Sequence, residues 1–178
     1  MKYAEELKRS MSYIGKKPKS IFLGQAVEVA GTAMSNTLKE VPKNKLHEFP
    51  VTEEMQMGVT IGLLMQNFIP ISIYPRWNFL ILAANQLINH LDKLNEMTKN
   101  QYKSKAIIRT SVGSEFPLHP QSQHVGDFSG AFKKISKTLN IVNLKKPEMI
   151  FPEYKKAFNR KDGVSTILVE YGDYYNLK

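Results

Sequence analysis

The sequence predicts an α/β fold with a mostly parallel sheet. Short apolar runs rich in β-branched residues alternate with longer segments in which apolar residues recur at helical spacing. Strands that alternate with helices along the chain are typical of parallel sheets covered by helices. The chain has 178 residues and shows no internal repeat and no clear linker, so we expect a single domain.

The chain begins with "AEELKRSMSYI" (4–14), an amphipathic segment that we expect to form a helical arm ahead of the core. The run "SIFLG" (20–24) predicts a short strand that ends at Gly24. Another short run follows at 47–50, and we expect it to lead into the first long helix of the core.

Thr52 is a natural N-cap for that helix, which we expect over 53–66 because its apolar residues recur at helical spacing. The β-branched run "IPISIY" (69–74) predicts a strand. The segment "NFLILAANQLINHLDK" (78–93) then predicts one long helix.

The second half of the chain repeats the alternation. The run "KAIIRTS" (105–111) predicts a strand, and "VGSEFPLHPQSQHVGD" (112–127) is a long loop rich in Pro, Gly, Ser and His. We expect the remaining elements to be a helix at 128–138, a strand at 140–144, a helix near 147–160 and a strand at 165–171.

Candidate ligand-binding residues lie at the carboxyl ends of these strands. In open parallel sheets, ligands bind in the loops that lead from the strands into the helices. The residues in those loops are Gly24 and Gln25, Glu53 and Glu54, Arg76 and Trp77, and the segment from His119 to His124.

Composition argues against several classes of protein. The net charge is +9, from 25 Lys and Arg against 16 Asp and Glu, but the lysines are scattered and form no arginine-rich stripe, so we do not expect nucleic-acid binding. The chain has no cysteine, which excludes disulfides and thiolate chemistry and fits a cytoplasmic protein. Its most apolar stretch is interrupted by polar residues and prolines, and we expect no membrane-spanning segment.

Glu53 and Glu54 have two interpretations. Acidic residues are common in the first turn of a helix because they interact favourably with the helix dipole. A carboxylate against an apolar floor would instead share a proton with a ligand nitrogen. Gly58 and Gly62 lie on one face of the same helix, and each costs about 1 kcal/mol relative to Ala in a helix interior, so we expect another backbone to approach that face.

Two other loops carry candidate residues. Trp77, the only tryptophan, is either a hydrophobic staple that closes a helix or a platform for a planar ring. His119 and His124 are either solvent-exposed or part of an active-site loop. Two histidines are too few for a metal site, and we expect none in this chain.

Four segments resemble, in order, the pyrimidine-binding domain of thiamine-diphosphate enzymes. "PVTEEMQMGVTIG" resembles its "P-I-S-E-x-x-x-x-G-x-x-x-G" motif, and "RWNFLILAANQLINHLDKL" its aromatic loop and following helix. "IIRTSVG" resembles its "I-R-[TS]-P-x-G" strand, and "PQSQHV" its glutamine-histidine loop. The resemblance covers residues 20–171 and is to the beta subunit of 2-oxo acid dehydrogenase decarboxylase components and, more distantly, to transketolases.

This resemblance implies the three-layer α/β/α fold of that family and roles for three residues. Glu53, rather than Glu54, falls on the glutamate that hydrogen-bonds N1′ of the cofactor's aminopyrimidine and promotes the tautomer that removes the thiazolium proton. Trp77 falls on an aromatic residue that packs against the pyrimidine. His124 falls on the loop histidine that faces the substrate, with His119 as the alternative.

The resemblance also implies a partner. We expect residues 1–178 to form one pyrimidine-binding domain, without the family's C-terminal domain and without the diphosphate-binding half whose "GDG…N" motif holds Mg²⁺. A separate diphosphate-binding subunit would supply that half. The resulting heterotetramer, with two copies of each subunit, would bind thiamine diphosphate and Mg²⁺ and act on a 2-oxo acid or a ketose. Asn85 replaces a usual Asp and the loop after His124 is longer, so the substrate stays open.

Two alternatives stay open. A phosphonopyruvate or sulfopyruvate decarboxylase also uses short separate subunits, although that branch lacks the "IRT-x-VG" and "QH" features. A non-catalytic binding module would use the positive charge for nucleic acid or an acidic partner. A salt-dependent gel shift would favour the binding module, whereas binding of thiamine diphosphate together with a second chain would favour an enzyme.

Overall fold

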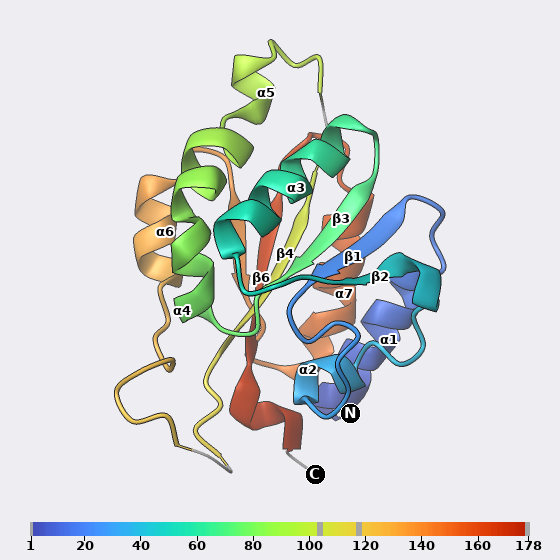
Figure 1. Ribbon diagram of the computed structural model, residues 1–178, viewed down its shortest axis with the longest axis vertical. Coiled ribbons are helices and arrows are strands. Elements are labelled where there is room, and N and C mark those ends of the chain that lie inside the picture. The colour runs from blue at the N-terminus through green and yellow to red at the C-terminus, as the bar shows by residue number, and fades with distance from the viewer. Residues whose placement is uncertain (1, 103–104, 117–118, 177–178) are drawn as a thin grey trace.

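The structure is a computed structural model that describes residues 2–102, 105–116 and 119–176. The described residues form a six-stranded sheet in the order β2-β1-β3-β4-β6-β5, and every neighbouring pair is parallel (Figure 1). The strands are β1 (Ser20–Gly24), β2 (Leu46–Glu48), β3 (Ile69–Ile73), β4 (Ile107–Val112), β5 (Asn140–Asn143) and β6 (Thr166–Tyr171).

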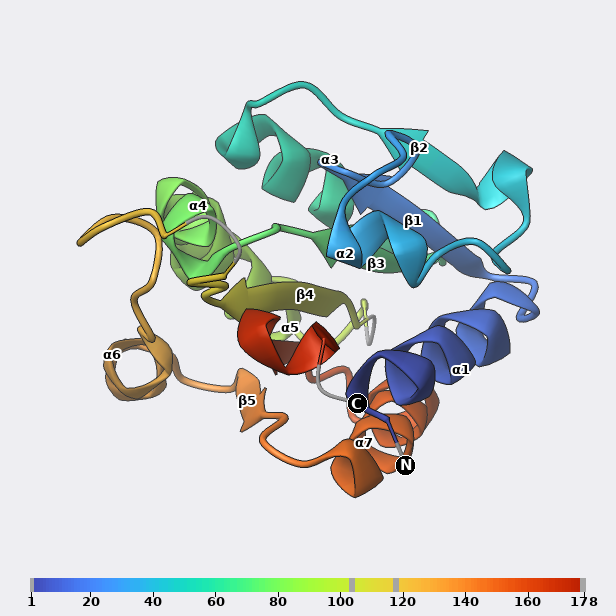
Figure 2. The same cartoon turned by 90° about the horizontal axis from the view of Figure 1, so that it is seen from below.

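Helices cover both faces of the sheet, which makes three layers (Figure 2). One face is covered by α1 (Tyr3–Gly15) and α7 (Pro147–Asn159), and the other by α3 (Glu53–Met65), α4 (Trp77–Leu80), η3 (Gln86–Leu91) and α6 (Ser129–Ile135). The predicted α/β/α arrangement with a parallel sheet is therefore confirmed. Shorter elements are α2 (Ala33–Asn36), η1 (Lys43–Lys45), η2 (Ile81–Ala83), α5 (Leu94–Met97) and η4 (Gly172–Asn176).

The central strands supply a core to both faces at once. Because successive side chains of a strand point to opposite faces, Ile107 packs beneath α1 and α7 while Ile108 packs beneath α3 and η3. On the neighbouring strand β6, Leu168 packs on the same side as Ile107, and Ile167 packs on the same side as Ile108. Continuous apolar runs in the sequence are thus explained by strands that are buried on both faces.

The N-terminal helix, expected as a helical arm ahead of the core, packs as part of the core. Leu7, Met11 and Ile14 of α1 are completely buried in the cluster between the sheet and α7. The Tyr3 hydroxyl also donates to the backbone oxygen of Leu144, which ties the start of α1 to the residue that follows β5. The amphipathic pattern identified the helix, but it could not tell a docked helix from an arm.

The long helix expected over 78–93 is broken into α4, η2 and the π-helix η3. The widened turn is visible where the N–H of Asp92 donates to the oxygen of Leu87 at 2.9 Å. It places Leu87 and Leu91 in the core and leaves the buried Asp92 carboxylate to accept the backbone N–H groups of residues 137–139 at 2.6–3.0 Å. A helical pattern alone does not reveal this change of pitch.

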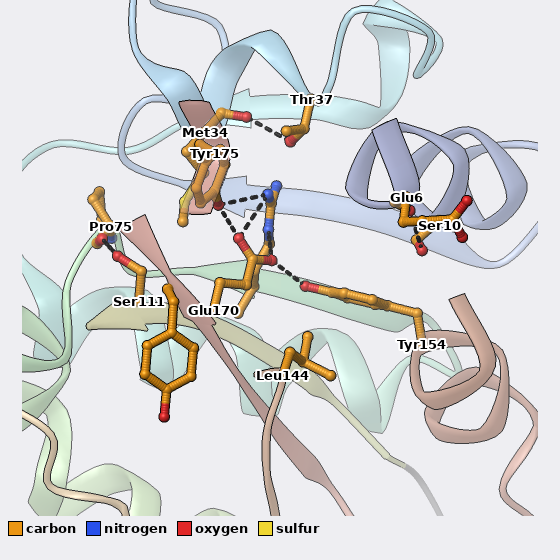
Figure 3. A network of polar contacts seen from close by, with 12 residues as sticks. Glu6, Ser10, Met34, Thr37, Pro75, Ser111, Leu144, Tyr154, Glu170 and Tyr175 are labelled. Atoms are coloured by element: carbon orange, nitrogen blue, oxygen red, sulfur yellow. Dashed lines mark hydrogen bonds and ion pairs between the residues drawn. The ribbon is translucent and has the colours of Figure 1, made fainter. Parts of the chain in front are cut away.

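A buried ion pair links the middle of β4 to the end of β6, and Figure 3 shows Glu170 with Tyr154 and Tyr175 around it. Arg109 donates to both carboxylate oxygens of Glu170 at 2.6 and 3.0 Å, and neither side chain is exposed. Tyr154 of α7 and Tyr175 of η4 donate their hydroxyls to the same carboxylate. Burial, followed by the charge of Glu170, raises the pKa of both tyrosines, so both hydroxyls stay protonated and remain donors.

Candidate functional site

The predicted edge of the sheet does gather candidate residues from three strands. Gln25 follows β1, Arg76 follows β3, and the segment that carries His124 follows β4. Glu53 begins α3 and lies beside Gln25, and Arg76 contacts the backbone of His124. The structure therefore brings Gln25 together with Glu53 and Arg76 together with His124 at the edge that the topological rule indicates, and no hydrogen bond among the described residues joins the two pairs.

Glu53 is a buried carboxylate with one satisfied oxygen. Its side chain is 4% exposed, and Oε1 accepts a hydrogen bond from Nε2 of Gln25 at 2.9 Å. Oε2 has no hydrogen-bond partner in the part of the chain that the structure describes, and the residue lines a cavity of about 760 Å³. The Tyr74 hydroxyl donates to the backbone oxygen of Glu53 at 3.3 Å and so helps to fix the first turn of α3. The carboxylate is thus held in place with one oxygen left for a ligand.

The loop that carries Gln25 is fixed by its own backbone. Gly24 has φ +142°, and a Cβ there would lie 2.1 Å from the backbone oxygen of Ile73, so only glycine fits. Beyond Gln25, the Glu48 carboxylate accepts the backbone N–H groups of residues 26, 27 and 28 at 2.7–2.8 Å. These contacts orient Gln25 toward Glu53 before any ligand binds.

Glu54 lines the same cavity as Glu53 but differs from it in exposure. It is exposed, and its Oε1 accepts a hydrogen bond from Nε2 of Gln86 at 3.0 Å. The structure therefore places Glu54 as an ordinary charge of the first helical turn. Thr52 precedes the helix as expected, but its side chain makes no capping hydrogen bond, so the predicted N-cap was wrong in that detail.

The glycine face of α3 is open. A Cβ built on Gly58 or Gly62 would meet no atom within 4 Å. Around it lie the apolar side chains of Met55, Val59 and Leu82, which are 47%, 38% and 63% exposed. Within the described residues nothing approaches the glycines, so the close contact expected from the sequence is not made inside this chain.

Trp77 lies in the core. Its side chain is completely buried and packs against Phe132 with ring centroids 5.0 Å apart, as a hydrophobic staple would. The ring offers no open face to a ligand in this arrangement, so a cofactor contact by Trp77 stays a prediction. Phe79, two residues on in α4, is a partly exposed aromatic side chain that sequence reasoning did not single out.

The two loop histidines have different surroundings. His124 is half-buried with its ring 5.1 Å from that of Phe79, and its Nδ1 is buried without a hydrogen-bond partner in the described chain. His119 is exposed, with Nε2 3.3 Å from Glu115 and Nδ1 accepting the backbone N–H of Gln121. Of the two, His124 is the less exposed and has a buried ring nitrogen without a partner among the described residues, which favours it as the ligand-facing residue.

Beneath the site lies a polar cluster that the sequence did not indicate. Gln56 and Thr60 lie on the inner face of α3 and are completely buried, although the buried face of a helix usually carries apolar residues. Gln56 donates to the Ser72 hydroxyl at 3.0 Å and to the backbone oxygen of Ile73 at 2.9 Å, and Thr60 donates to Ser72 at 2.9 Å. These bonds fix α3 against β3 and thereby set the position of Glu53.

Two further properties concern the described residues only. They contain no group of three or more His, Cys, Asp or Glu side chains arranged to hold a metal ion. No helix formed by them is both long enough and apolar enough to cross a bilayer.

Comparison with solved structures finds a similar fold in a protein described as a split-gene transketolase in an inactive beta4 tetramer. The TM-score is 0.60 at 14% sequence identity, and the match covers 94% of this chain and 50% of that one. The present chain thus spans half the length of the transketolase chain. No family model matches the sequence, and no curated protein matches it either. At this identity the likeness establishes the fold alone: the chain has a three-layer α/β fold similar to part of a split-gene transketolase.

Proposed function

We propose that this chain is the pyrimidine-binding subunit of a heteromeric thiamine-diphosphate-dependent enzyme that acts on a 2-oxo acid or a ketose. The observation that carries the proposal is Glu53, a buried carboxylate at the carboxyl edge of the sheet, with one oxygen held by Gln25 and the other free beside a cavity. The fold similarity to a split-gene transketolase supports the same assignment.

The residues present fit an aminopyrimidine ring. Oε2 of Glu53 would accept or share a proton with a ring nitrogen, and Gln25 would keep the carboxylate from rotating away. Glu53 is largely buried, and a hydrogen bond to it would strengthen further once a second chain excluded the remaining water. When bound, thiamine diphosphate supplies a nucleophilic carbon and an electron sink for making or breaking the bond beside a carbonyl.

His124 is the residue we assign to the substrate. A nitrogen of its half-buried ring would donate a hydrogen bond to a substrate oxygen or accept one from a substrate hydroxyl, and the Phe79 ring lies against it at 5.1 Å. The backbone of His124 is held by Arg76 at 2.8 Å, which limits the freedom of the loop. Trp77 remains assigned to the cofactor by the motif resemblance, with Phe79 as the more exposed aromatic residue of α4.

We further infer that a second subunit completes the site and supplies the diphosphate-binding "GDG…N" motif and the Mg²⁺ ligands. The open face of α3 supports this: Gly58 lines the cavity, Gly62 lies one turn further on, and two helix-interior glycines with exposed apolar neighbours suit contact with another chain. The similar solved structure is described as an inactive tetramer of beta chains, and a chain that is inactive without its partner is what we propose here. A heterotetramer with two copies of each subunit is the assembly we expect.

Calorimetry tests the assignment. The chain is titrated with thiamine diphosphate and Mg²⁺, first alone and then mixed with a diphosphate-binding subunit encoded nearby in the genome. We expect no binding by the chain alone and binding by the mixture. If no combination binds the cofactor, the proposed function is wrong.

A matched pair of variants tests the role of Glu53. Glu53→Gln keeps the acceptor for Gln25 but cannot hold the proton, so turnover of the assembled enzyme should fall by about 10²–10⁴-fold with assembly intact. Glu54→Gln removes an exposed charge that contacts only Gln86 in the described chain and should change turnover little. Equal effects of the two substitutions would show that Glu53 is not the proton-sharing residue.

A further inference from the structure

A second cavity lies at the same edge of the sheet and shares no lining residue with the Glu53 cavity. Its volume is about 230 Å³, and its walls come from the segments that follow β1, β3, β4 and β6. Figure 3 shows part of it, with Ser111 bonded to Pro75 and the ring of Tyr175 beside Met34. The volume is below that of typical pockets for whole small molecules and suits one functional group.

Arg76 is the charged residue of this cavity. Its Nη1 donates to the backbone oxygen of His124 at 2.8 Å and of Ser114 at 3.3 Å. Nε and Nη2, the two nitrogens on the other edge of the guanidinium, have no partner among the described residues. The side chain is therefore anchored on one edge and free on the edge that suits bidentate binding of an oxyanion.

Asp173 is the nearby acid that would compete for this arginine. Its Oδ1 accepts the backbone N–H groups of Glu115 and Phe116 at 2.9 and 3.2 Å, so the carboxylate is already held elsewhere. No ion pair with Arg76 within 4 Å forms in the described chain. Burial lowers the pKa of Arg76 and Asp173 opposes this, and a desolvated cation with free donors gains more from an anion than a hydrated one does.

We propose that this cavity binds a compact oxyanion, a carboxylate or a phosphate group, through the free edge of Arg76. Resting on the function proposed above, we assign the oxyanion to the anionic end of the substrate. Arg76 connects the oxyanion site to the reaction site, because it also donates to the backbone oxygen of His124, the residue assigned to the reacting end of the substrate. A substrate fixed at both ends would be oriented for reaction by its charge.

Nuclear magnetic resonance of the full-length chain labelled with ¹⁵N tests the site directly. Inorganic phosphate and, separately, pyruvate are titrated, and we expect the amides of residues 111–114 and 32–34 to shift. The anion that binds more tightly identifies whether the group is a phosphate or a carboxylate. Arg76→Gln should weaken binding about tenfold or more, which corresponds to about 1.4 kcal/mol. Arg76→Lys keeps the positive charge but loses the two parallel N–H donors of the guanidinium, so its affinity for the anion should lie between those of Arg76→Gln and wild type.

Arg160→Gln is the matched control, because it removes the same charge from an arginine that pairs with Asp162 at the opposite edge of the sheet. It should leave the affinity unchanged. Shifts confined to other residues, or equal affinities for Arg76→Gln and wild type, would overturn the proposal. If Arg76→Gln does not fold, equal anion affinities of Arg76→Lys and wild type would contradict the proposed bidentate contact with the guanidinium. Cofactor binding by the mixed subunits does not use Arg76, so failure of the proposed function would be seen separately in the calorimetry.

Discussion

Filling the open glycine face of α3 should stabilise the isolated chain but weaken its assembly with a partner. In Gly58→Ala and Gly62→Ala each new methyl group would point into open space, since no atom lies within 4 Å. Both positions are inside a 13-residue helix, where Ala is favoured over Gly by about 0.8–1 kcal/mol. The double variant should therefore be more stable by about 2 kcal/mol as an isolated chain. For a chain of this size, that raises the melting temperature by about 4–8 °C.

Assembly should change in the other direction. If the partner subunit packs on this face, two added methyl groups would have to be accommodated in a close contact, at a cost of about 1–3 kcal/mol each. Thermal unfolding followed by circular dichroism measures the first effect. Sedimentation velocity of the mixture with the diphosphate-binding subunit measures the second.

Gly130→Ala provides the matched control. Gly130 lies in α6, and a Cβ there also meets no atom within 4 Å. This substitution should leave assembly unchanged. A double variant at Gly58 and Gly62 that is less stable in isolation would show that the glycines serve the fold of the chain itself. A double variant that is more stable and assembles normally would show that the partner binds elsewhere.

Three substitutions test the contacts that support the site, each by urea unfolding. Gly24→Ala should destabilise the chain by about 2 kcal/mol or more, because the backbone is left-handed and the Cβ meets the oxygen of Ile73; a neutral result would contradict the packing described. Glu170→Gln should cost about 3–5 kcal/mol by leaving Arg109 charged and buried, and a loss below about 1 kcal/mol would show that Arg109 finds another partner. Burial raises the pKa of Asp92, but hydrogen bonds from residues 137–139 outweigh it and hold the pKa below its ordinary value. Its contribution to stability is therefore complete above about pH 4 and lost as the pH falls through the lower folded value, so Asp92→Asn should flatten the acid limb of the stability profile.

The strands of this fold could be predicted from the sequence because they are buried on both faces and read as continuous apolar runs. The helix breaks between Trp77 and Leu91 could not, since the π-turn depends on where Asp92 meets the backbone of residues 137–139. For the same reason the pairing of Arg109 with Glu170 is invisible in the sequence: 61 positions separate them, and neither stands in a local motif. Local periodicity reports which face is apolar, and tertiary partners decide the rest.

In the candidate site, too, local sequence predicted some features, while distant residues determined the others. The resemblance to the family motif, aligned on Gly58 and Gly62, favours Glu53 over Glu54, and the structure gives the two acids different surroundings, one buried and one exposed. Trp77 shows the limit of such reasoning, because a loop position says nothing about which way a ring turns. Phe132, more than 50 positions away, supplies the surface on which that ring packs.

One helix carries both the free carboxylate oxygen of Glu53 and the open glycine face, and this links assembly to chemistry. Glu53 begins α3, and Gly58 lies in the next turns along the same cavity. A second chain that packed on Gly58 and Gly62 would therefore also cover the approach to Glu53 and exclude water from it. In the isolated chain that approach is open to solvent, and a hydrogen bond to a ring nitrogen would compete with water. If the proposed partner packs there, a chain without it would keep its fold and lack activity, because that partner would supply a wall of the site as well as the diphosphate ligands proposed for it.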